Sequence, residues 1–228
     1  AGALQGAGTA SLAGPVTLAT ASAIGAATAS DTLTLKNQVS GTGPLTKVGN
    51  GVVELSGSND YTGGTTIEAG TLRLLTGATL LNLSPVSLTG TGTLDLNSTD
   101  QSIGNLTGTA GTAITLGSGD LSVIQGTAGI FAGRISGSGD LIKQGTAALT
   151  LSGASSSYTG TTRVLSGTLV ATGSGSSLGT GAGQVSNGAT LLIDGVDLIT
   201  GGLTLNGSGV GGAGALQGAG TASLAGPV

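Results

Sequence analysis

Short alternating segments that end in glycine recur along the chain, and they constrain its fold more than any other feature. Aliphatic residues occupy every second position of each segment, so they share one face of an extended strand. Val53 and Leu55, for example, would point inward while Glu54 points outward. The pattern predicts half-buried β-strands, and the lack of a sustained 3.6-residue period predicts almost no helix. The segments lie at 52–57, 70–75, 92–97, 112–117, 147–153, 189–195 and 202–207.

The chain also repeats itself on two scales. Residues 41–72 align with residues 137–169, with one residue inserted in the second copy. Residues 213–228 reproduce residues 1–16 without a change, so the sequence that begins at Ala1 begins again at Ala213. We therefore expect a single β-helix segment over 1–228. It would consist of one tandem unit (1–212) that contains two half-units, followed by the start of the next unit (213–228).

Regular strands, glycine corners and internal repeats together indicate an all-β solenoid of the parallel β-helix type. The phrase "GSGDL" occurs at 117–121 and again at 137–141, and this spacing is a plausible single turn of roughly 20 residues. With turns of that length, the unit 1–212 would have about ten rungs and an axis of about 50 Å. Residues 1–16 and 213–228 should then adopt the same conformation at opposite ends, with Leu4 and Leu216, and likewise Leu12 and Leu224, facing the interior alike.

Composition excludes several classes of function. The chain has 47 glycines, only three aromatic residues and 7% charged residues, where typical soluble domains have roughly 25% charged residues. Its six basic residues are scattered, which is unlike a nucleic-acid-binding surface. No apolar run approaches the length of a membrane-spanning helix, so we expect no membrane insertion of this segment. Histidine and cysteine are absent, which removes the usual catalytic triads, and we expect no cofactor and no metal site.

Two pairs of carboxylates leave other functions open. Asp194 and Asp197 are close in sequence and could form the acid/base pair of a polysaccharide lyase or hydrolase, since β-helices host both classes. The alternative, which we favour, is that they are corner residues on either side of Gly195. Asp120 and Asp140 in the "GSGDL" phrases could suggest calcium, but their spacing is much longer than that of the calcium-binding nonapeptide repeat, so turn chemistry is the better interpretation.

Lys47 matches Lys143 across the two half-units, and Tyr61 matches Tyr158. A ligand-binding groove is one interpretation of these matched side chains. We favour the other, in which the tyrosine rings cover the body of the helix at a loop and the lysine stems pack over apolar rungs.

The stretch "LTKVGNGVVELSGSNDYTGGTTIEAGTLRLL" resembles the passenger-associated β-strand repeat of bacterial autotransporters. The second copy departs from the pattern where Thr161 replaces Gly64. The resemblance implies a right-handed parallel β-helix that is secreted across the outer membrane of a Gram-negative bacterium and displayed on its surface, with no catalytic residues. The residues that we assign to the structural signature are Lys47, Gly49, Leu55, Gly57, Tyr61, Gly63, Gly70 and Leu72 in the first copy, and Lys143, Gly145, Leu151, Gly153, Tyr158, Gly160, Gly167 and Leu169 in the second.

The function that we expect from the sequence is therefore that of a non-enzymatic stalk segment in a large, repetitive surface protein. The segment would project something distal or offer an adhesive lateral face. Its partners would be neighbouring identical units joined head to tail, and possible further partners are glycans or proteins of a host or bacterial surface. The alternative is a carbohydrate-active β-helix enzyme.

Overall fold

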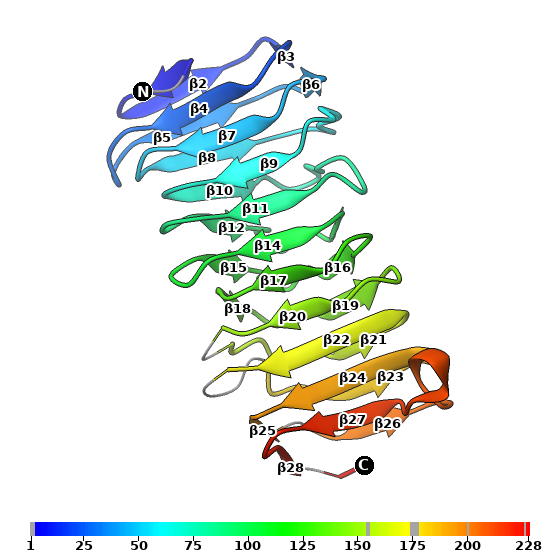
Figure 1. The fold of residues 1–228 in the computed structure, drawn as a ribbon. Coiled ribbons are helices and arrows are strands. Elements are labelled where there is room, and N and C mark those ends of the chain that lie inside the picture. The colour runs from blue at the N-terminus through cyan, green and yellow to red at the C-terminus, as the bar shows by residue number, and fades with distance from the viewer. Residues whose placement is uncertain (1–2, 154–155, 174–177, 200, 226) are drawn as a thin grey trace.

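In the computed structural model the chain winds into an elongated parallel β-solenoid with two or three strands in each turn. The structure describes residues 3–153, 156–173, 178–199, 201–225 and 227–228. For residues 197–199 only the backbone is described. The N-terminus lies at one end of the solenoid and the C-terminus at the other (Figure 1). The expected all-β parallel architecture is confirmed, because all the pairings between strands are parallel and the solenoid completes about ten turns.

The longest face of the solenoid is an 11-stranded sheet to which each successive turn contributes one strand. Its strands are β1 (Leu4–Gly6), β4 (Ser22–Ala26), β7 (Leu45–Val48), β9 (Thr65–Ile67), β11 (Val86–Leu88), β14 (Leu106–Gly108), β17 (Gly129–Phe131), β20 (Leu149–Leu151), β22 (Gly167–Thr172), β24 (Ala189–Asp194) and β27 (Leu216–Ala219).

The second face is a seven-stranded sheet that follows the first face around a corner. It contains β2 (Thr9–Leu12), β5 (Thr32–Leu35), β8 (Val52–Leu55), β10 (Thr71–Leu74), β12 (Thr93–Asp95), β15 (Ala113–Thr115) and β18 (Arg134–Ser136). A separate pair, β25 (Asp197–Ile199) and β28 (Ser223–Ala225), follows β24 and β27 along the chain in the same way.

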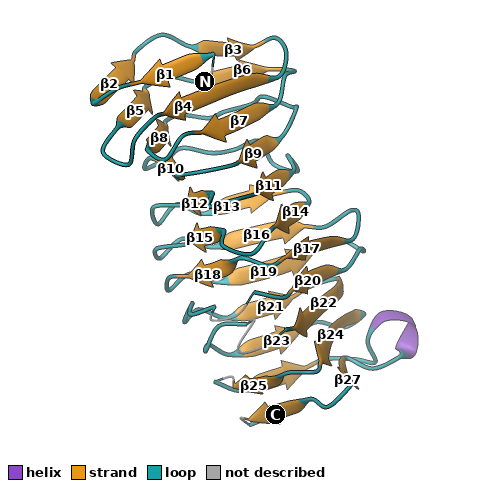
Figure 2. Ribbon diagram, turned by 60° about the vertical axis from the view of Figure 1, so that its left-hand side comes forward, coloured by secondary structure: helices purple, strands orange, loops and turns teal. Residues whose placement is uncertain are grey.

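The third face is a six-stranded sheet, and a two-stranded sheet takes the same place in the first turns. The six strands are β13 (Gln101–Ile103), β16 (Leu121–Ile124), β19 (Leu141–Gln144), β21 (Thr162–Val164), β23 (Gly183–Val185) and β26 (Leu203–Leu205), and the two are β3 (Val16–Leu18) and β6 (Val39–Gly41). One short 3-10 helix, η1 (Val210–Gly212), protrudes from the loop before β27 (Figure 2).

Ladders of aliphatic side chains fill the interior between the three faces. On the second face, directly stacked residues form one such ladder, in which every member is at most 3% exposed; it consists of Leu33, Val53, Leu72, Leu94, Ile114 and Ile135. Burying a side chain of this size contributes roughly 1.5–3 kcal/mol, so the ladders are the main source of stability. The alternation read from the sequence is confirmed, since Val53 and Leu55 are buried and Glu54 lies outward.

The two copies of the sixteen-residue repeat lie at opposite ends of the structure. Their strands β1 and β27 are the first and last strands of the 11-stranded sheet. Leu4, Leu216 and Leu224 are partly buried against the core. Leu12 stacks in register on the buried Leu35, so it lies on the inward side of its strand, but it remains 37% exposed. β2 is the outermost strand of its sheet, so among the described residues no further strand covers Leu12 from the other side.

Candidate functional site

Each half-unit of the sequence folds into the same local structure, which we call a two-rung corner. In residues 45–74, β7 turns a corner into β8, the chain passes along the third side, and β9 and β10 stack on the first pair. In residues 141–171, β19 and β20 form the first rung, and β21 and β22 stack on them. The two copies therefore share one topology of strand, corner, strand and return.

A fully buried lysine joins the two rungs of each corner. Lys47 is 0% exposed, and its Nζ donates hydrogen bonds to the carbonyl oxygens of Val48 (3.1 Å), Gly49 (2.7 Å) and Ala69 (2.9 Å). Val48 and Gly49 belong to the same rung as the lysine, whereas Ala69 lies in the corner of the next rung. The ammonium group thus uses its three N–H donors to tie one corner to the next.

Lys143 repeats this arrangement in the second copy. Its side chain is also 0% exposed, and its Nζ donates to the carbonyl oxygens of Gln144 (2.9 Å), Gly145 (2.9 Å) and Ser166 (3.0 Å). Burial lowers the pKa of both lysines to about 8, because the charged form loses its hydration. The three carbonyl dipoles act in the opposite direction and favour the ammonium form.

The corner that the lysine binds strongly favours glycine. Gly49 has φ of 75° and Gly145 has φ of 78°, a region that side chains rarely adopt. A Cβ atom would also collide with a backbone carbonyl of the preceding rung, Ala26 O in one copy and Gln125 O in the other. Positive φ therefore favours glycine at these two positions, and close stacking leaves no room for a Cβ atom.

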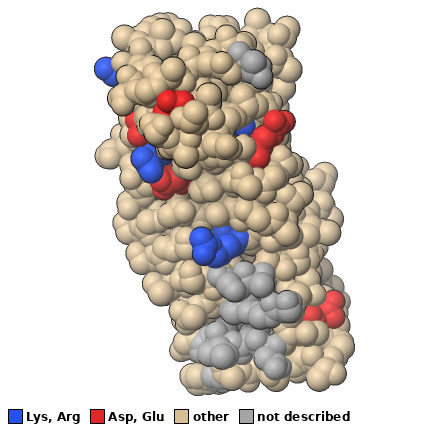
Figure 3. All heavy atoms as spheres, turned by 90° about the vertical axis from the view of Figure 1, so that its left-hand side faces the viewer, with Lys and Arg blue, Asp and Glu red and all other residues tan. Residues whose placement is uncertain are grey.

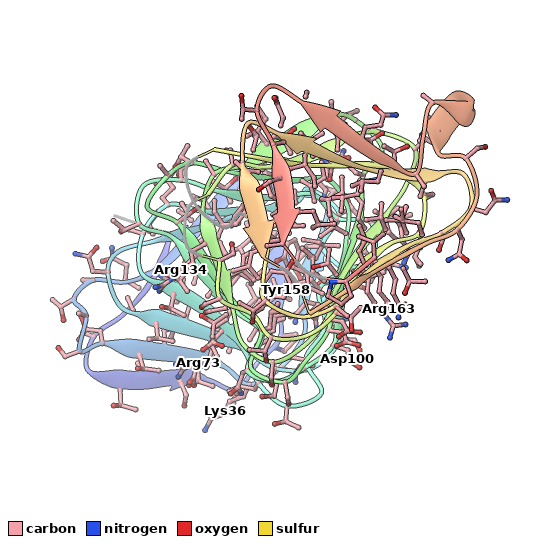
Figure 4. All side chains as sticks on the ribbon, turned by 90° about the horizontal axis from the view of Figure 1, so that it is seen from below. Lys36, Arg73, Asp100, Arg134, Tyr158 and Arg163 are labelled. Carbon is pink, nitrogen blue, oxygen red and sulfur yellow. The ribbon has the colours of Figure 1, made fainter. Side chains whose placement is uncertain are left out.

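In each copy, a buried tyrosine lies just before the strand that begins the second rung. Tyr61 is 1% exposed and its hydroxyl lies 2.7 Å from Thr65 Oγ1, at the start of β9. Tyr158 is 0% exposed and lies 2.6 Å from Thr162 Oγ1, at the start of β21. Burial raises the pKa of both phenols because it disfavours the phenolate. In a view along the solenoid, Tyr158 lies within its outline, whereas Lys36 and Arg73 lie toward its edge (Figure 4).

A polar side chain just before each tyrosine caps the preceding rung. Asn59 is 2% exposed and its Oδ1 accepts the backbone N–H of Val39 at 2.9 Å. At the equivalent position in the second copy, Ser156 Oγ accepts the N–H of Ile135 at 3.3 Å. Asparagine and serine therefore both accept a backbone N–H of the preceding rung in their own copy, a shared role that sequence comparison alone does not reveal.

The favoured interpretation of the matched lysines and tyrosines is wrong about their location. The lysine stems do not lie over the outside of the rungs, and the tyrosine rings are inside the solenoid rather than on its surface. The alternation of the strand could have predicted the burial of the lysine, because Lys47 is two residues after the buried Leu45 and so lies on the same inward face. With their polar atoms bonded inside, the four side chains are not presented to an external ligand.

The remaining signature residues form the frame of the two corners. The leucines Leu55, Leu72, Leu151 and Leu169 are at most 1% exposed. The glycines Gly57, Gly70 and Gly167 have positive φ, and a Cβ at Gly63, Gly153 or Gly160 would collide with backbone atoms of the preceding turn.

The two corners face different sides of the solenoid. Strands β7 and β8 lie in the 11-stranded and seven-stranded sheets, whereas their equivalents β19 and β20 lie in the six-stranded and 11-stranded sheets. The offset between the two half-units is therefore not a whole number of turns. By contrast β1 and β27, which begin at the equivalent residues Leu4 and Leu216, belong to the same sheet, so the longer period corresponds to a whole number of turns.

The aspartates of the "GSGDL" phrases form a ladder of backbone caps. The N–H of Asp120 donates to Asp100 Oδ1 and the N–H of Asp140 donates to Asp120 Oδ1, both at 2.8 Å. Asp140 also accepts the N–H of Thr161 and pairs with Arg163 at 3.1 Å. Leu121 stacks on Leu141, which confirms that the spacing of the two phrases is one turn. Turn chemistry accounts for these carboxylates, and the described residues contain no group of three potential metal ligands.

Asp194 and Asp197 lie on either side of a corner. Asp194 ends β24, Asp197 begins β25, and Gly195 between them has φ of 66°. The side chain of Asp197 lies outside the described part of the chain, and so does the expected pairing of the two carboxylates.

The surface carries few charges, and several of these are paired. Arg73 contacts Asp95 at 2.8 Å and Glu54 at 3.5 Å, and Thr34 Oγ1 donates to Glu54 at 2.7 Å. These residues stack on consecutive rungs of the second face. Figure 3 shows how sparse such side chains are on one side of the molecule.

The surface also carries shallow hollows. One, of about 410 Å³, lies along the third side between Asp60, Asn82 and Asp100. The buried amides of Asn59 and Gln101 that line it are already bonded to the backbone. Among the described residues there is no helix with the length and apolar character needed to cross a membrane.

Comparisons with known proteins match the two-rung corners to a family. The passenger-associated-transport-repeat matches residues 45–74 and 141–171, which begin and end in the strands of the two corners. The chain is 37% identical to the Adhesin BmaC autotransporter of Brucella suis over 147 residues, which are 62% of this chain and 4% of that protein. It is 31% identical to the uncharacterized lipoprotein YdeK of Escherichia coli over 109 residues, 48% of this chain and 8% of that protein.

The chain thus spans a small fraction of the length of these two relatives. No solved structure matches it. The bounds of the family match coincide with the structural repeat, and the resemblance inferred from the sequence is confirmed. The chain therefore carries two copies of the passenger-associated-transport-repeat, each built as a two-rung corner of one parallel β-solenoid.

Proposed function

We propose that this chain is a spacer segment of a long stalk that an autotransporter passenger displays on the surface of a Gram-negative bacterium. Copies of the unit 1–212 would follow one another head to tail. The observation that carries the proposal is the continuous stack of about ten turns, whose first and last strands lie in the same sheet. With a rise of about 4.8 Å per turn, such a unit would extend the stalk by about 48 Å.

The two-rung corners support a mechanical role. Each corner joins two successive turns through a hydrogen bond from a buried lysine, in addition to the strand pairing. Bonds of this kind lie in the dry interior, where water does not compete for them. They would therefore resist shear between turns, which is the deformation that a projecting rod experiences.

The absence of histidine and cysteine supports a role without catalysis. Asp95 and Glu54 pair with Arg73, and Asp120 and Asp140 accept backbone N–H groups, so these carboxylates are engaged in structural contacts. We expect no new reducing ends and no unsaturated products when the chain is incubated with a panel of polysaccharides. Turnover that Asp194→Asn abolishes would support an enzyme and contradict the stalk.

An adhesive lateral face is a further part of the proposal. One relative carries the name of an adhesin, and surface glycans or proteins of a host or bacterium are the corresponding partners. Binding of the purified chain to cultured epithelial cells or to bacterial cells would test this part, with the same chain after heat denaturation as the control. A chain that binds neither surface would act only as a spacer.

The projecting role can be tested on cells. A small binding module placed beyond one, two or three units should become more accessible to a bead-bound ligand as units are added, because each unit lifts it further from the membrane. Glycine- and serine-rich inserts of the same residue number are the control, since a flexible coil gains reach only with the square root of its length. Equal accessibility for folded and flexible inserts would contradict the proposal.

A further inference from the structure

A hollow on the outside of the solenoid is lined by the side chain of Arg134. It has a volume of about 380 Å³, and its walls are residues 110–113 and 132–134, which lie on successive rungs at the corner between the 11-stranded and seven-stranded sheets. Further rungs lie on both sides of these two, so the hollow does not depend on either end of the chain. Figure 4 shows Arg134 at the outer edge of the molecule, away from Asp100.

Arg134 is exposed, and among the described residues its guanidinium forms no ion pair and no hydrogen bond. Arg73, on the same face, lies between Glu54 and Asp95 of the neighbouring strands and pairs with both. The in-register neighbour of Arg134 is Ala113, and β18 is the last strand of its sheet. No paired strand therefore places a carboxylate beside Arg134.

Backbone N–H groups in the walls of the hollow also lack acceptors. Within the described part of the chain, the N–H groups of Ala110, Gly111 and Gly133 donate no hydrogen bond. Gly133 is buried, and a buried N–H without an acceptor is rare in folded proteins. Successive N–H groups in a turn can form a concave site for an anion. The lining thus combines an unpaired cation with three donors that have no partner within the protein.

The floor of the hollow is held open by its neighbours. A Cβ atom at Gly133 would collide with Thr112 Oγ1 and with the ring of Phe131, which is 1% exposed. The Thr112 hydroxyl is itself fixed, because it donates a hydrogen bond to Thr109 O at 2.7 Å. The hollow is therefore formed before any ligand arrives, and binding does not have to order a loop.

We propose that this hollow binds an anionic substituent of a saccharide, either a carboxylate or a sulfate ester. The planar guanidinium of Arg134 can donate two parallel hydrogen bonds to such a group. The volume lies within the range of small-ligand sites, about 300–1,000 Å³. Apart from Arg134, the lining consists of glycine, alanine and threonine, so no large apolar side chain is present, which favours a ligand rich in hydroxyl groups over a peptide. The inference deepens the adhesive lateral face of the proposed function and rests on it.

Binding of soluble polysaccharides to the immobilised chain 1–228 tests the site. The probes are polygalacturonate, which carries carboxylates, dextran sulfate, which carries sulfate esters, and uncharged dextran. We expect anionic polymer to bind and dextran not to bind, and raising NaCl from about 0.05 M to about 0.5 M should weaken the binding. The comparison of polygalacturonate with dextran sulfate shows which of the two anionic groups the hollow prefers.

Three variants assign the binding to the hollow. Arg134→Gln should lower the affinity at least about tenfold, because it removes the charge-assisted hydrogen bonds. Lys36→Gln is the matched control: it removes an exposed cation far from the hollow and should change the affinity less than about twofold. Ala110→Pro removes a free N–H without breaking a hydrogen bond of the protein, and should weaken binding several-fold. The melting temperatures of the three variants show that each is folded.

The inference is overturned if the anionic polymers bind no better than dextran, or if Arg134→Gln binds them as tightly as Lys36→Gln. Polyglutamate that competes as strongly as polygalacturonate would overturn the assignment to a saccharide. A chain that binds cells but no anionic polymer would keep the adhesive face and refute this site. A chain that binds the polymer through Arg134 but does not bind cells would keep the site and refute the adhesive face.

Discussion

Lys47 and Lys143 have the least expected environment of any residues in this chain. Each is fully buried, and each donates to three backbone carbonyls from two successive corners. Cations are rarely buried without a charged partner. Here the partners are carbonyl dipoles, which converge because two stacked corners place them around one point. Each lysine is thus a structural part of its two-rung corner.

Removing the ammonium should destabilise the corner strongly. Lys47→Met keeps the aliphatic stem but leaves three carbonyls without a donor, and we expect the free energy of unfolding to fall by about 3 kcal/mol. Lys36→Met is the matched control, because Lys36 is exposed and should change stability by less than about 0.5 kcal/mol. Urea titration followed by circular dichroism measures both, and similar losses for the two variants would contradict the assigned role.

The buried lysines also predict a pH dependence. Burial lowers their pKa to about 8, so the unfolded chain binds more protons than the folded chain between pH 8 and the ordinary lysine value. The free energy of unfolding should therefore rise as the pH increases from about 8. Above about pH 10 it should fall, because burial raises the pKa of Tyr61 and Tyr158 and only the unfolded chain releases their protons.

Thermal melts between pH 7 and 11 would measure this profile. The double variant Lys47→Met with Lys143→Met should lose the rise above pH 8 and keep the fall above pH 10. A rise of the same size in the double variant would show that the lysines do not cause it.

At the scale of elements, the alternating segments predict strands on all three faces, including β26 of the third face within 202–207. Segments such as 52–57 and 70–75 contain β8 and β10, and their inward leucines are buried as expected. Strands such as β13 and β21 lie outside the predicted segments, because each contains only one aliphatic residue, Ile103 or Val164, and so shows no alternation. The exposed helix η1 also lies outside any periodic pattern.

The sequence predicted the residues of the candidate site but not their contacts. The repeat comparison identified which residues matter, and alternation from Leu45 places Lys47 on the inward face. The carbonyl partners of the lysine depend on the stacking of two rungs, which one strand does not reveal. The equivalence of Asn59 and Ser156 likewise follows from their shared hydrogen bond to the preceding rung.

The corner glycines give a test at this scale. Gly49→Ala combines positive φ with a collision against Ala26 O, and we expect a loss of at least about 2 kcal/mol. Gly77→Ala is the control, because Gly77 has φ of 80° but no atom within 4 Å of the added Cβ, so strain alone should cost about 1 kcal/mol. Denaturant melts that rank Gly77→Ala as the more damaging change would refute the stacking argument.

At the scale of the whole molecule, the sequence repeats with two different periods. The family repeat recurs after an incomplete number of turns and so points to a different side each time, whereas the longer period, from Ala1 to Ala213, returns to the same sheet. Units joined at this longer period would present identical faces along one line. The repeated sixteen residues reveal the length of this period, but only the strand order shows that it corresponds to whole turns.

The molecule should respond weakly to salt and to chelators. Few residues are charged, and Arg73, which joins the largest surface network, is itself 38% exposed, so 1 M NaCl should change the free energy of unfolding by less than about 1 kcal/mol. EDTA should leave the melting temperature unchanged, with calcium added back as the control. A large drop with EDTA that calcium reverses would favour a calcium role for the aspartate ladder.

The most direct test of the stalk is the length of joined units. Chains of one, two and three copies of the unit 1–212, measured by small-angle X-ray scattering, should show a cross-section that stays constant and a length that grows by about 48 Å per unit. The constant increment follows from whole turns that continue one into the next. A cross-section that grows with unit number, or a length increment well below the predicted one, would contradict a continuous rod.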